Sequence, residues 1–522
     1  MTFADGGTGR ATRPRGVARV TGHRSASAHR SPGRAEAPVS DLKSRIDSLV
    51  QAATPGQSGF RLLLSGQDAF NARAEAIAQA TESLDLQYYI THDGISTRLL
   101  LGELLQAANR GVRIRLLLDD FASDARDHRI LLSAAHPNIE MKVFNPPNKG
   151  RKRATTRPLG RLLELPHQHR RMHNKLLLAD RNLVVMGGRN LGDEYYDADP
   201  ERNFVDIDLL CIGPVASDFS ASFEAYWQHS LAVPIDQSLR KSIKRFGRKH
   251  QPRPLAQEID DACNKDPDQC ALLTAYRRTP QLGTWLDQLV WATGTALWDP
   301  PGKLATASVP DEGQMMIAPL LPVAQGVRRE LMLVSAYFVP TWAGLAYLSD
   351  CAGRGVSVRV LTNSLEATDV PLVHGGYQPY RTALLNAGVR LFEMRKKPAT
   401  HSRYRLADTP VSLHSKAAVF DNRQVFIGPL NLDPRSVLWN SEVGVLVDSP
   451  TLANAVRQLL AEGQTGTVSY EVEVDGSTRS AGLVWNYEDD QGRALKHKRE
   501  PANPWRRFNA WLARLLRVEP FL

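Results

Sequence analysis

Two segments of the chain carry the same chemically capable residues in the same order. One reads HNKLLLADRNLVVMGGRN from His173 to Asn190, and the other reads HSKAAVFDNRQVFIGPLN from His414 to Asn431. The offset is constant (414 − 173 = 241). The matched pairs are His173 and His414, Lys175 and Lys416, Asp180 and Asp421, Gly187 and Gly428, and Asn190 and Asn431. A lone His-x-Lys is common on solvated strand edges, but five residue types repeated at one offset indicate two functional half-sites.

The spacing predicts which side chains act together. His and Lys at positions i and i+2 lie on the same face of a strand, because strand side chains alternate. The triplets at 180–182 and 421–423 predict turns. A second strand then ends at a glycine, which lets backbone and ligand approach closely. The asparagine follows just past this strand and is expected on the same rim of the sheet as the histidine and lysine. This set suits a phosphodiester, because lysine binds phosphate as a point charge and asparagine can donate to a phosphate oxygen.

Two histidines allow a two-step reaction. A neutral imidazole can attack phosphorus and form a phosphohistidine, while a protonated imidazole gives its proton to the leaving alcohol and then activates the incoming one. The residues alone do not order the two histidines. The predicted catalytic set is His173, Lys175, Asp180, His414, Lys416 and Asp421, and the predicted phosphate-binding set is Asn190, Asn431, Lys175 and Lys416.

Each imidazole also needs a carboxylate to fix its tautomer. Glu442 opens the segment EVGVLV and is predicted to orient the histidine of its own half. Asp206, in DIDLLCI, is the predicted counterpart in the first half, with Asp208 on the same face. Glu201 lies at the same offset from its histidine as Glu442 but in a looser stretch, and it ranks lower.

An internal repeat predicts the elements that position these residues. Strand, helix and strand patterns occur at 83–90, 98–109 and 110–120, and again at 331–338, 342–352 and 354–364. This order implies parallel pairing with a right-handed crossover. We therefore expect an α/β protein with two similar lobes, each with a mixed sheet, related by a pseudo-twofold axis, with the active site at their interface. The predicted parts are a disordered basic segment (1–45), lobe 1 (46–245), a connector (246–315) with an amphipathic helix at 281–297, lobe 2 (316–465) and a C-terminal extension (466–522).

Composition narrows the class of protein. The 522 residues are 42% hydrophobic and 23% charged, which excludes general disorder and a coiled-coil rod. The net charge of +10 comes from the ends, since residues 1–40 sum to +5 (7 − 2), residues 491–522 to +6 (8 − 2), and the rest to −1. A near-neutral body is not typical of a duplex-DNA binder, and basic ends suit an anionic membrane surface or solvated tails.

The chain shows no apolar stretch of about 18 residues and no apolar h-region, which on its own predicts a cytoplasmic protein. HExxH, paired CxxC and nucleotide-binding motifs do not occur, so no metal site is predicted. Four cysteines exclude a disulfide framework. Cys263 and Cys270 could form a disulfide in an oxidising compartment, but two reduced thiols are the favoured interpretation.

Basic and aromatic residues suggest a surface for lipid. Basic runs at 149–171 and 395–405 each precede an active-site strand. Each run is either a solvated loop or a surface that attracts lipid headgroups at the mouth of the cleft. The C-terminal sequence PWRRFNAWLARLLRVEPFL has helical apolar spacing. It is either a helix packed on the body or an interfacial helix with Trp and Leu among the headgroups.

The twin H-x-K-x4-D-x6-G-x2-N pattern resembles the phospholipase D superfamily. Segments such as LDLQYYI, RGVRIRLLLDD, RRMHNKLLLAD, GGRNLGDEYYD, IGPLNLDPRS and NSEVG resemble bacterial cardiolipin synthases of the C type, from about residue 50 to the C-terminus. The resemblance implies phosphatidyl transfer without metal or other cofactor, with His173 as nucleophile and His414 as acid and base. Pro429 and Gly188 stand where the family usually has Ser, so a hydroxyl donor is missing from both half-sites.

The predicted function is synthesis of cardiolipin from phosphatidylglycerol and a second phospholipid, with phosphatidylethanolamine a candidate, through a phosphatidyl-histidine. The alternatives are a phospholipase D-type hydrolase, since transfer requires the alcohol to outcompete water, and a nuclease or phosphodiesterase of the same fold. The near-neutral body argues against the nuclease. The expected partners are phospholipids and an anionic membrane surface rather than nucleic acid. The expected location is peripheral on a bacterial inner membrane, with the face and the oligomeric state left open.

Overall fold

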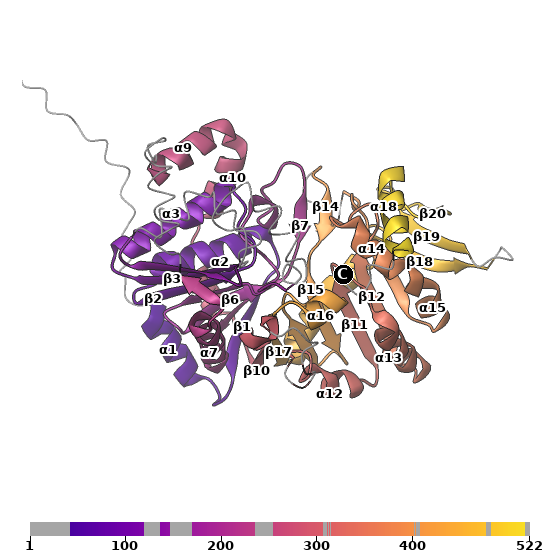
Figure 1. Cartoon of the computed structure of the whole chain (residues 1–522), viewed down its shortest axis with the longest axis horizontal. Helices are drawn as coiled ribbons and strands as arrows, with labels where there is room; N and C mark the ends of the chain where they lie inside the picture. The colour runs from indigo at the N-terminus through magenta and orange to yellow at the C-terminus, as the bar shows by residue number, and fades with distance from the viewer. Residues whose placement is uncertain are drawn as a thin grey trace, which may run out of the picture. The chain divides into compact units, whose positions relative to one another are not determined.

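One series of paired strands runs through both halves of the chain in the computed structural model (Figure 1), which holds an 18-stranded sheet. Lobe 1 contributes, in pairing order, β9 (Ala232–Pro234), β4 (Ile139–Phe144), β3 (Arg113–Asp119), β2 (Ser83–Tyr88), β5 (Leu176–Ala179), β6 (Leu183–Gly187), β8 (Asp208–Ile212) and β1 (Ser58–Leu63). The series continues through β10 (Val290–Trp298) of the connector into lobe 2, with β17 (Val443–Asp448), β16 (Gln424–Ile427), β15 (Lys416–Phe420), β11 (Glu330–Ser335), β12 (Ser357–Asn363) and β13 (Arg390–Met394). It ends in the C-terminal extension with β18 (Ser469–Asp475), β19 (Gly482–Glu488) and β20 (Ala494–His497).

The structure describes residues 42–119, 136–146, 170–234, 254–305, 311, 313, 315–400, 402, 404, 408–476 and 482–516. These residues lie in one compact unit, Asp41–Leu522. The N-terminal segment predicted to be disordered lies outside the described residues as far as position 41. So do most of the basic run at 149–171 and the arginines at 403 and 405. The domain boundaries predicted from the sequence stay predictions.

The two lobes repeat one plan, as predicted. β2, β3 and β4 are parallel, and β5 pairs antiparallel with β2. β11, β12 and β13 are likewise parallel, and β15 pairs antiparallel with β11. α3 (Ile95–Asn109) connects β2 to β3, and α13 (Thr341–Gly353) connects β11 to β12. The expected α/β fold with two mixed sheets is therefore confirmed.

A core shared by both lobes holds them together. α7 (Pro214–Gln228) and α17 (Pro450–Gly463) both contribute to it, with Phe219 and Phe223 from α7 and Val456 and Leu460 from α17. Two further cores form under α2 (Gly66–Gln79) and α3 in lobe 1, and under α13 and α15 (Arg381–Asn386) in lobe 2. Because one apolar cluster includes strands of both sheets, the lobes are expected to keep a fixed arrangement.

The helix predicted at 281–297 is wrong beyond its first turns. α11 (Leu282–Leu286) is short, and β10 begins at Val290. β10 pairs with β1 on one edge and β17 on the other, so it joins the two sheets. Ladder hydrogen bonds on both edges override the helical apolar spacing that the sequence shows here.

The expectation of two reduced thiols is also corrected. α9 (Leu255–Lys265) and α10 (Pro267–Tyr276) form a helical hairpin against α3, and Asp266 caps α10 by accepting from Gln269 N. This turn brings the Cα atoms of Cys263 and Cys270 to 5.1 Å, and the two residues form a disulfide. Cys211 and Cys351 are buried free thiols.

The C-terminal helix α18 (Pro504–Leu515) packs through its small residues against α14 (Pro371–Tyr377). Ala510 and Ala513 are buried, and they lie against Gly375 of α14. Asn503 caps α18 by accepting from Arg506 N. The interpretation as a helix packed on the body is therefore confirmed, although its large apolar residues stay exposed. The interfacial interpretation stays a prediction.

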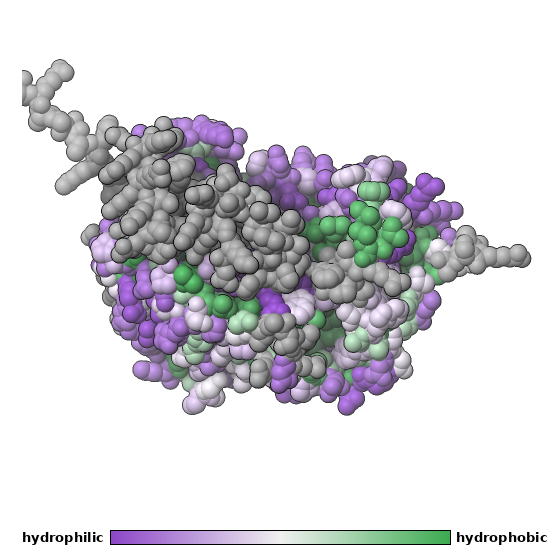
Figure 2. All heavy atoms as spheres, viewed as in Figure 1, coloured by the Kyte–Doolittle hydropathy of each residue, from purple (hydrophilic) through white to green (hydrophobic). Residues whose placement is uncertain are grey.

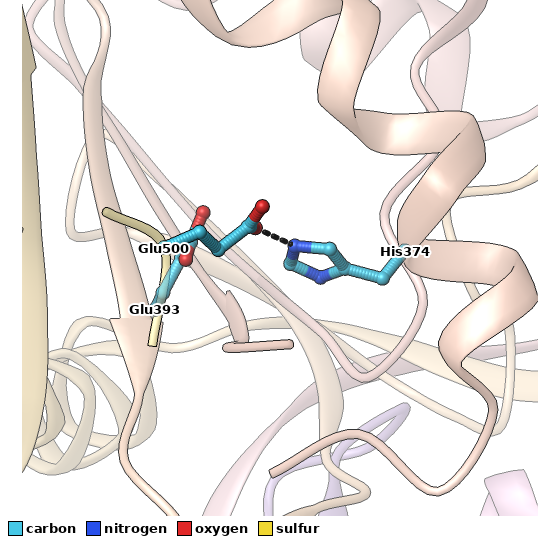
Figure 3. Close-up of side chains that lie close together, drawn as sticks. All are labelled: His374, Glu393 and Glu500. Atoms are coloured by element: carbon cyan, nitrogen blue, oxygen red, sulfur yellow. Dashed lines mark hydrogen bonds and ion pairs between the residues drawn. The ribbon is translucent and has the colours of Figure 1, made fainter. Parts of the chain in front are cut away.

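A polar cluster fastens the segment that precedes α18. Glu500 bonds Nε2 of His374 at 2.6 Å (Figure 3) and accepts from the Arg381 guanidinium at 2.7 Å. Arg381 also donates to Glu393 at 3.0 Å. His374, Glu393 and Glu500 bring three potential metal ligands together, but Arg381 bonds both carboxylates and balances their charge. The cluster therefore serves as a tether for the C-terminal extension.

We expect Gly375→Ala to loosen α18. The added Cβ would lie 2.4 Å from the carbonyl oxygen of Ala510, and such overpacking typically costs about 1–3 kcal/mol. Limited proteolysis should cut this variant faster within 504–515 than the wild type. Gly353→Ala is the matched control, because a Cβ at that helical position meets no atom within 4 Å. Equal cleavage of the two variants would contradict the packing described here.

Candidate active site

The two histidines are oriented by carboxylates from the opposite lobe. His173 Nδ1 bonds the Glu442 carboxylate at 2.9 and 3.0 Å, and His414 Nδ1 bonds Asp206 at 2.6 Å. The sequence predicted both carboxylates but paired each with the histidine of its own lobe, and that pairing is wrong. All four side chains are buried, with each imidazole about 10% exposed. Since Nδ1 is engaged, Nε2 of each ring is the nitrogen available to a substrate.

Backbone pairing between the lobes explains the exchange. β14 (Val411–Leu413), just before His414, runs parallel to β7 (Asn203–Val205), just before Asp206. His414 N donates to Val205 O at 2.8 Å. In the other half, His173 N donates to Ser441 O at 2.8 Å, next to Glu442. Each histidine therefore enters the site alongside the strand that delivers the other lobe's carboxylate.

Both lysines lie beside their histidines, as the i and i+2 spacing predicts. Lys175 Nζ donates to the carbonyl oxygen of His173 at 2.6 Å, and Lys416 Nζ donates to that of His414. Lys175 is fully buried and Lys416 nearly so. Lys175 Nζ also lies 5.3 Å from the centroid of the Tyr89 ring. Two buried ammonium groups therefore flank the imidazoles.

The asparagines lie at the ends of the strands that follow. Asn190 is buried, with Oδ1 accepting from Ile90 N and Nδ2 donating to the Tyr195 hydroxyl at 2.8 Å. Asn431 is also buried, and its Oδ1 accepts from Tyr337 N. In each half the side-chain oxygen accepts from a backbone N–H, so the amide nitrogen points away from that backbone donor. This orientation is compatible with the predicted contact to a phosphate oxygen.

Asp180 and Asp421 are not in the site, although the sequence placed them in the catalytic set. They follow β5 and β15, at the strand ends opposite the histidines. Both have positive φ (49° and 53°), and their carboxylates accept several backbone N–H groups. The donors are Thr81, Glu82 and Ser83 for Asp180, and Arg328, Arg329 and Glu330 for Asp421. The repeated Asp therefore holds the start of β2 or β11, because Asp tolerates a left-handed turn and caps free amides.

Gly187 and Gly188 make room for carboxylates rather than for a ligand. A Cβ on Gly187, whose φ is +155°, would lie 2.1 Å from Asp208 Oδ1, and one on Gly188 would lie 2.2 Å from Asp206 Oδ1. Asp208 forms a buried ion pair with Arg73 at 2.9 Å, so it does not orient a histidine. Glu201, the lower-ranked alternative, is exposed. A serine at position 188 would displace Asp206, which explains the departure from the usual family residue there.

Burial and like charges set the protonation states. Burial lowers the pKa of His173 well below its usual range, and Lys175 and Lys416 lower it further. Burial likewise lowers the pKa of His414, with Lys416 adding to this and Asp206 opposing it. Burial raises the pKa of Glu442 well above its usual range. Burial alone would raise the pKa of Asp206, but His414 and Lys416 outweigh it and lower the pKa.

The lysines are also shifted. Burial lowers the pKa of Lys175 well below its usual range, and burial lowers the pKa of Lys416 to about 8 although Asp206 and Glu442 raise it. An anion that enters the site would stabilise the protonated form of both lysines.

Sequence reasoning missed several residues that surround the imidazoles. The Tyr89 ring lies edge-on to His173 at 5.0 Å, and Tyr195 and Phe204 lie 5.3 and 5.1 Å from His414. Asp299 was interpreted only as part of a chain break, yet its Oδ2 accepts from Glu442 N at 2.9 Å and pairs with Lys303 at 3.0 Å. The aromatic pairs in QYYI and DEYYD were the sequence signals that could have indicated Tyr89 and Tyr195.

Comparison with known proteins decides the family. The family model described as "Cardiolipin synthase, PLD-like domain" matches residues 74–227 and 322–462. The chain belongs to this phospholipase D-like family. Cardiolipin synthase C of Escherichia coli K12 is 35% identical over 475 residues, which cover 89% of this chain and 96% of that protein. Cardiolipin synthase B of Salmonella typhi is 25% identical, covering 82% and 84%.

A solved structure shares the fold of this phospholipase D-like chain. Phosphatidylserine synthase from Haemophilus influenzae Rd KW20 aligns with a TM-score of 0.56 and 13% identity, covering 92% of this chain and 99% of that one. The likeness shows that the two chains share a fold over nearly their whole length.

We expect kcat/KM to fall as pH rises through about 8, because Lys416 loses its charge above its pKa. The measurement is a pH profile of turnover under subsaturating substrate. Lys416→Arg stays charged and should move this alkaline limb upward by at least about one pH unit, even where its absolute rate is lower. An alkaline limb that stays near the wild-type position in Lys416→Arg would assign the titration to another group.

Proposed function

We propose that this chain transfers a phosphatidyl group to phosphatidylglycerol and so makes cardiolipin, through a phosphatidyl-histidine intermediate. The observation that carries the proposal is the pair of imidazoles, each held through Nδ1 by a carboxylate of the other lobe. Two buried lysines beside them supply the charge that a phosphodiester requires. Family membership and the similarity to cardiolipin synthase C support the same reaction class and phospholipid substrates.

In the first step, Nε2 of His173 attacks phosphorus, and the bond from phosphorus to the alcohol of the donor headgroup breaks. His414 gives its Nε2 proton to that leaving oxygen. Different pKa shifts support this order. Burial and the neighbouring lysines lower the pKa of His173 well below its usual range, which suits a neutral nucleophile. Burial lowers the pKa of His414 as well, but Asp206 opposes that shift and favours a proton on this ring.

In the second step, His414 takes the proton from the hydroxyl of the acceptor lipid. The acceptor oxygen attacks phosphorus, the bond from phosphorus to His173 Nε2 breaks, and the free imidazole is restored. Lys175 and Lys416 balance the charge of the non-bridging oxygens in both steps, and Asn190 and Asn431 donate to them. Asp206 and Glu442 position the imidazoles without touching the substrate.

We expect His173→Ala and His414→Ala each to abolish formation of cardiolipin, because one removes the nucleophile and the other the proton donor. The assay supplies labelled phosphatidylglycerol with phosphatidylethanolamine and identifies products by mass. Retention of more than about a tenth of the wild-type rate by either histidine variant would contradict the two-histidine mechanism. Phosphatidic acid as the sole wild-type product would identify a hydrolase.

We also expect wild-type turnover to persist in excess chelator, since the two lysines already balance the phosphate charge. The same assay with added chelator measures this.

We further propose that the chain works peripherally on an anionic bacterial inner membrane and docks through α18. The exposed apolar residues of this helix are Trp505, Phe508, Trp511, Leu515 and Leu516. Figure 2 shows hydrophobic residues gathered where Figure 1 places α18. Arg507 and Arg514 are exposed on the same helix, and Lys496 and Lys498 precede it. Among the described residues, no helix is both long and apolar enough to cross a bilayer.

We expect Trp505→Ser combined with Trp511→Ser to weaken binding to vesicles, because both indoles are exposed and available to insert at the headgroup level. Co-sedimentation with vesicles of about 30% and of no phosphatidylglycerol measures the effect, and added salt should weaken binding to the anionic vesicles. Leu272→Ser is the matched control, since Leu272 is an exposed apolar residue of α10 in the connector. Equal sedimentation of the double variant and the control at both compositions would remove α18 from the proposed contact.

A further inference from the structure

A cavity of about 610 Å³ adjoins His414, within the size range of small-ligand pockets. Its wall includes Tyr195 and Phe204, whose rings contact the His414 imidazole. Lobe 2 and the C-terminal helix complete it with Asp369 and Arg506. His414 is the histidine to which the proposed mechanism gives the leaving and incoming oxygens. The cavity therefore lies on the alcohol side of the reaction.

Three cations line this cavity, namely Arg202, Lys396 and Arg506. Within the described chain, none of their charged groups forms an ion pair with a carboxylate. The Arg202 guanidinium lies 5.3 Å from the Phe204 ring centroid, and Arg506 donates to two backbone carbonyls. Burial lowers the pKa of Arg506, and the positive charge of Arg202 lowers it further although Asp369 and Glu366 oppose this. The guanidinium groups are therefore close enough to repel, which an anion between them would relieve.

Five carboxylates also line the cavity, and four of them already accept hydrogen bonds or form an ion pair, while the fifth, Glu201, is exposed to solvent. Asp369 accepts from the Tyr337 hydroxyl at 2.8 Å, and Glu366 accepts from the Tyr470 hydroxyl at 2.9 Å. Glu194 pairs with His92, and Asp199 accepts from backbone amides. A wall with both charges suits a ligand that combines an anion with hydroxyl groups, since a carboxylate accepts from a hydroxyl.

The acceptor for cardiolipin synthesis has this chemistry. Phosphatidylglycerol offers a glycerol hydroxyl, and three carbons away it carries a phosphodiester of its own. Water and simple alcohols lack that second anion. An enzyme that transfers to phosphatidylglycerol must therefore place a second negative charge near the first, which needs cations beyond those that hold the reacting phosphate.

We infer that this cavity is the acceptor subsite, in which Arg202, Lys396 and Arg506 bind the phosphodiester that the acceptor lipid already carries. The inference rests on the proposed transfer reaction. It assigns these three residues to acceptor specificity, while Lys175 and Lys416 serve the phosphorus that reacts. Selection of a phosphodiester-bearing alcohol over a neutral one is the property they confer.

The test compares two soluble acceptors in the full-length chain, which removes any effect of membrane affinity. The donor is dihexanoyl phosphatidylglycerol below its micellar concentration. The acceptors are isotopically labelled glycerol and glycerophosphoglycerol, which differ in the phosphodiester. The double variant Arg202→Gln and Lys396→Gln is used because neither side chain donates a hydrogen bond to the described fold. We expect the ratio of transfer to glycerophosphoglycerol over transfer to glycerol to fall by about tenfold.

Lys397→Gln is the matched control, since Lys397 is an exposed neighbour of Lys396 that does not line the cavity. The ratio should stay at the wild-type value in this variant. An unchanged ratio in the double variant, or an equal fall in Lys397→Gln, would overturn the acceptor subsite while leaving the transferase intact. A wild-type chain that releases only phosphatidic acid with both acceptors would overturn the proposed function itself.

Discussion

Each imidazole of the candidate active site takes its orientation from a carboxylate that belongs to the other lobe. Neither lobe therefore contains a complete half-site, and the distances of 2.6–3.0 Å between ring and carboxylate depend on how the lobes are joined. The rest of the architecture meets this requirement at three levels. β10 links the two sheets, the β7 and β14 strands pair across the interface, and one apolar core includes both lobes. A loss of rigidity at any of these levels would reach both histidines, because both carboxylates cross the same interface.

The same exchange makes the site electrostatically unequal although the repeat is symmetric in sequence. Burial raises the pKa of Glu442 well above its usual range, Lys175 and Lys303 oppose this, and Asp299 and Asp433 add to it. Asp206 lies nearer to cations, and its pKa is lowered. The pKa of both imidazoles is lowered, but only at His414 does the facing carboxylate appear among the main causes, where Asp206 opposes the shift. In the proposed mechanism this difference in surroundings separates the nucleophile from the acid and base.

The repeat in the sequence was sufficient to predict the two lobes, their parallel strands and the gathering of histidines, lysines and asparagines. Periodicity and spacing report only the local structure of one segment. They could not show which histidine Glu442 faces, and the structure pairs it with His173 rather than His414. The repeated Asp180 illustrates a different limit, because a residue that recurs for the sake of a turn looks the same in sequence as one that recurs for chemistry. β10 and the Cys263–Cys270 bond depend on what packs beside them, which the local pattern does not contain.

The C-terminal helix connects the proposed lipid surface to the chemistry. Trp505 is exposed, while Arg506, the next residue, faces the cavity beside His414. Adjacent residues of a helix are about 1.5 Å apart along its axis. The exposed face that carries Trp505 and the cavity face that carries Arg506 are therefore fixed relative to each other within one turn. The tether of Glu500 to His374 and Arg381 fixes that turn on lobe 2. In the proposed docking, a helix placed in this way would set the depth of the reacting site relative to the headgroups. A lipid acceptor could then bring its hydroxyl to His414 while its acyl chains stay in the bilayer, and no spanning segment is required for that approach.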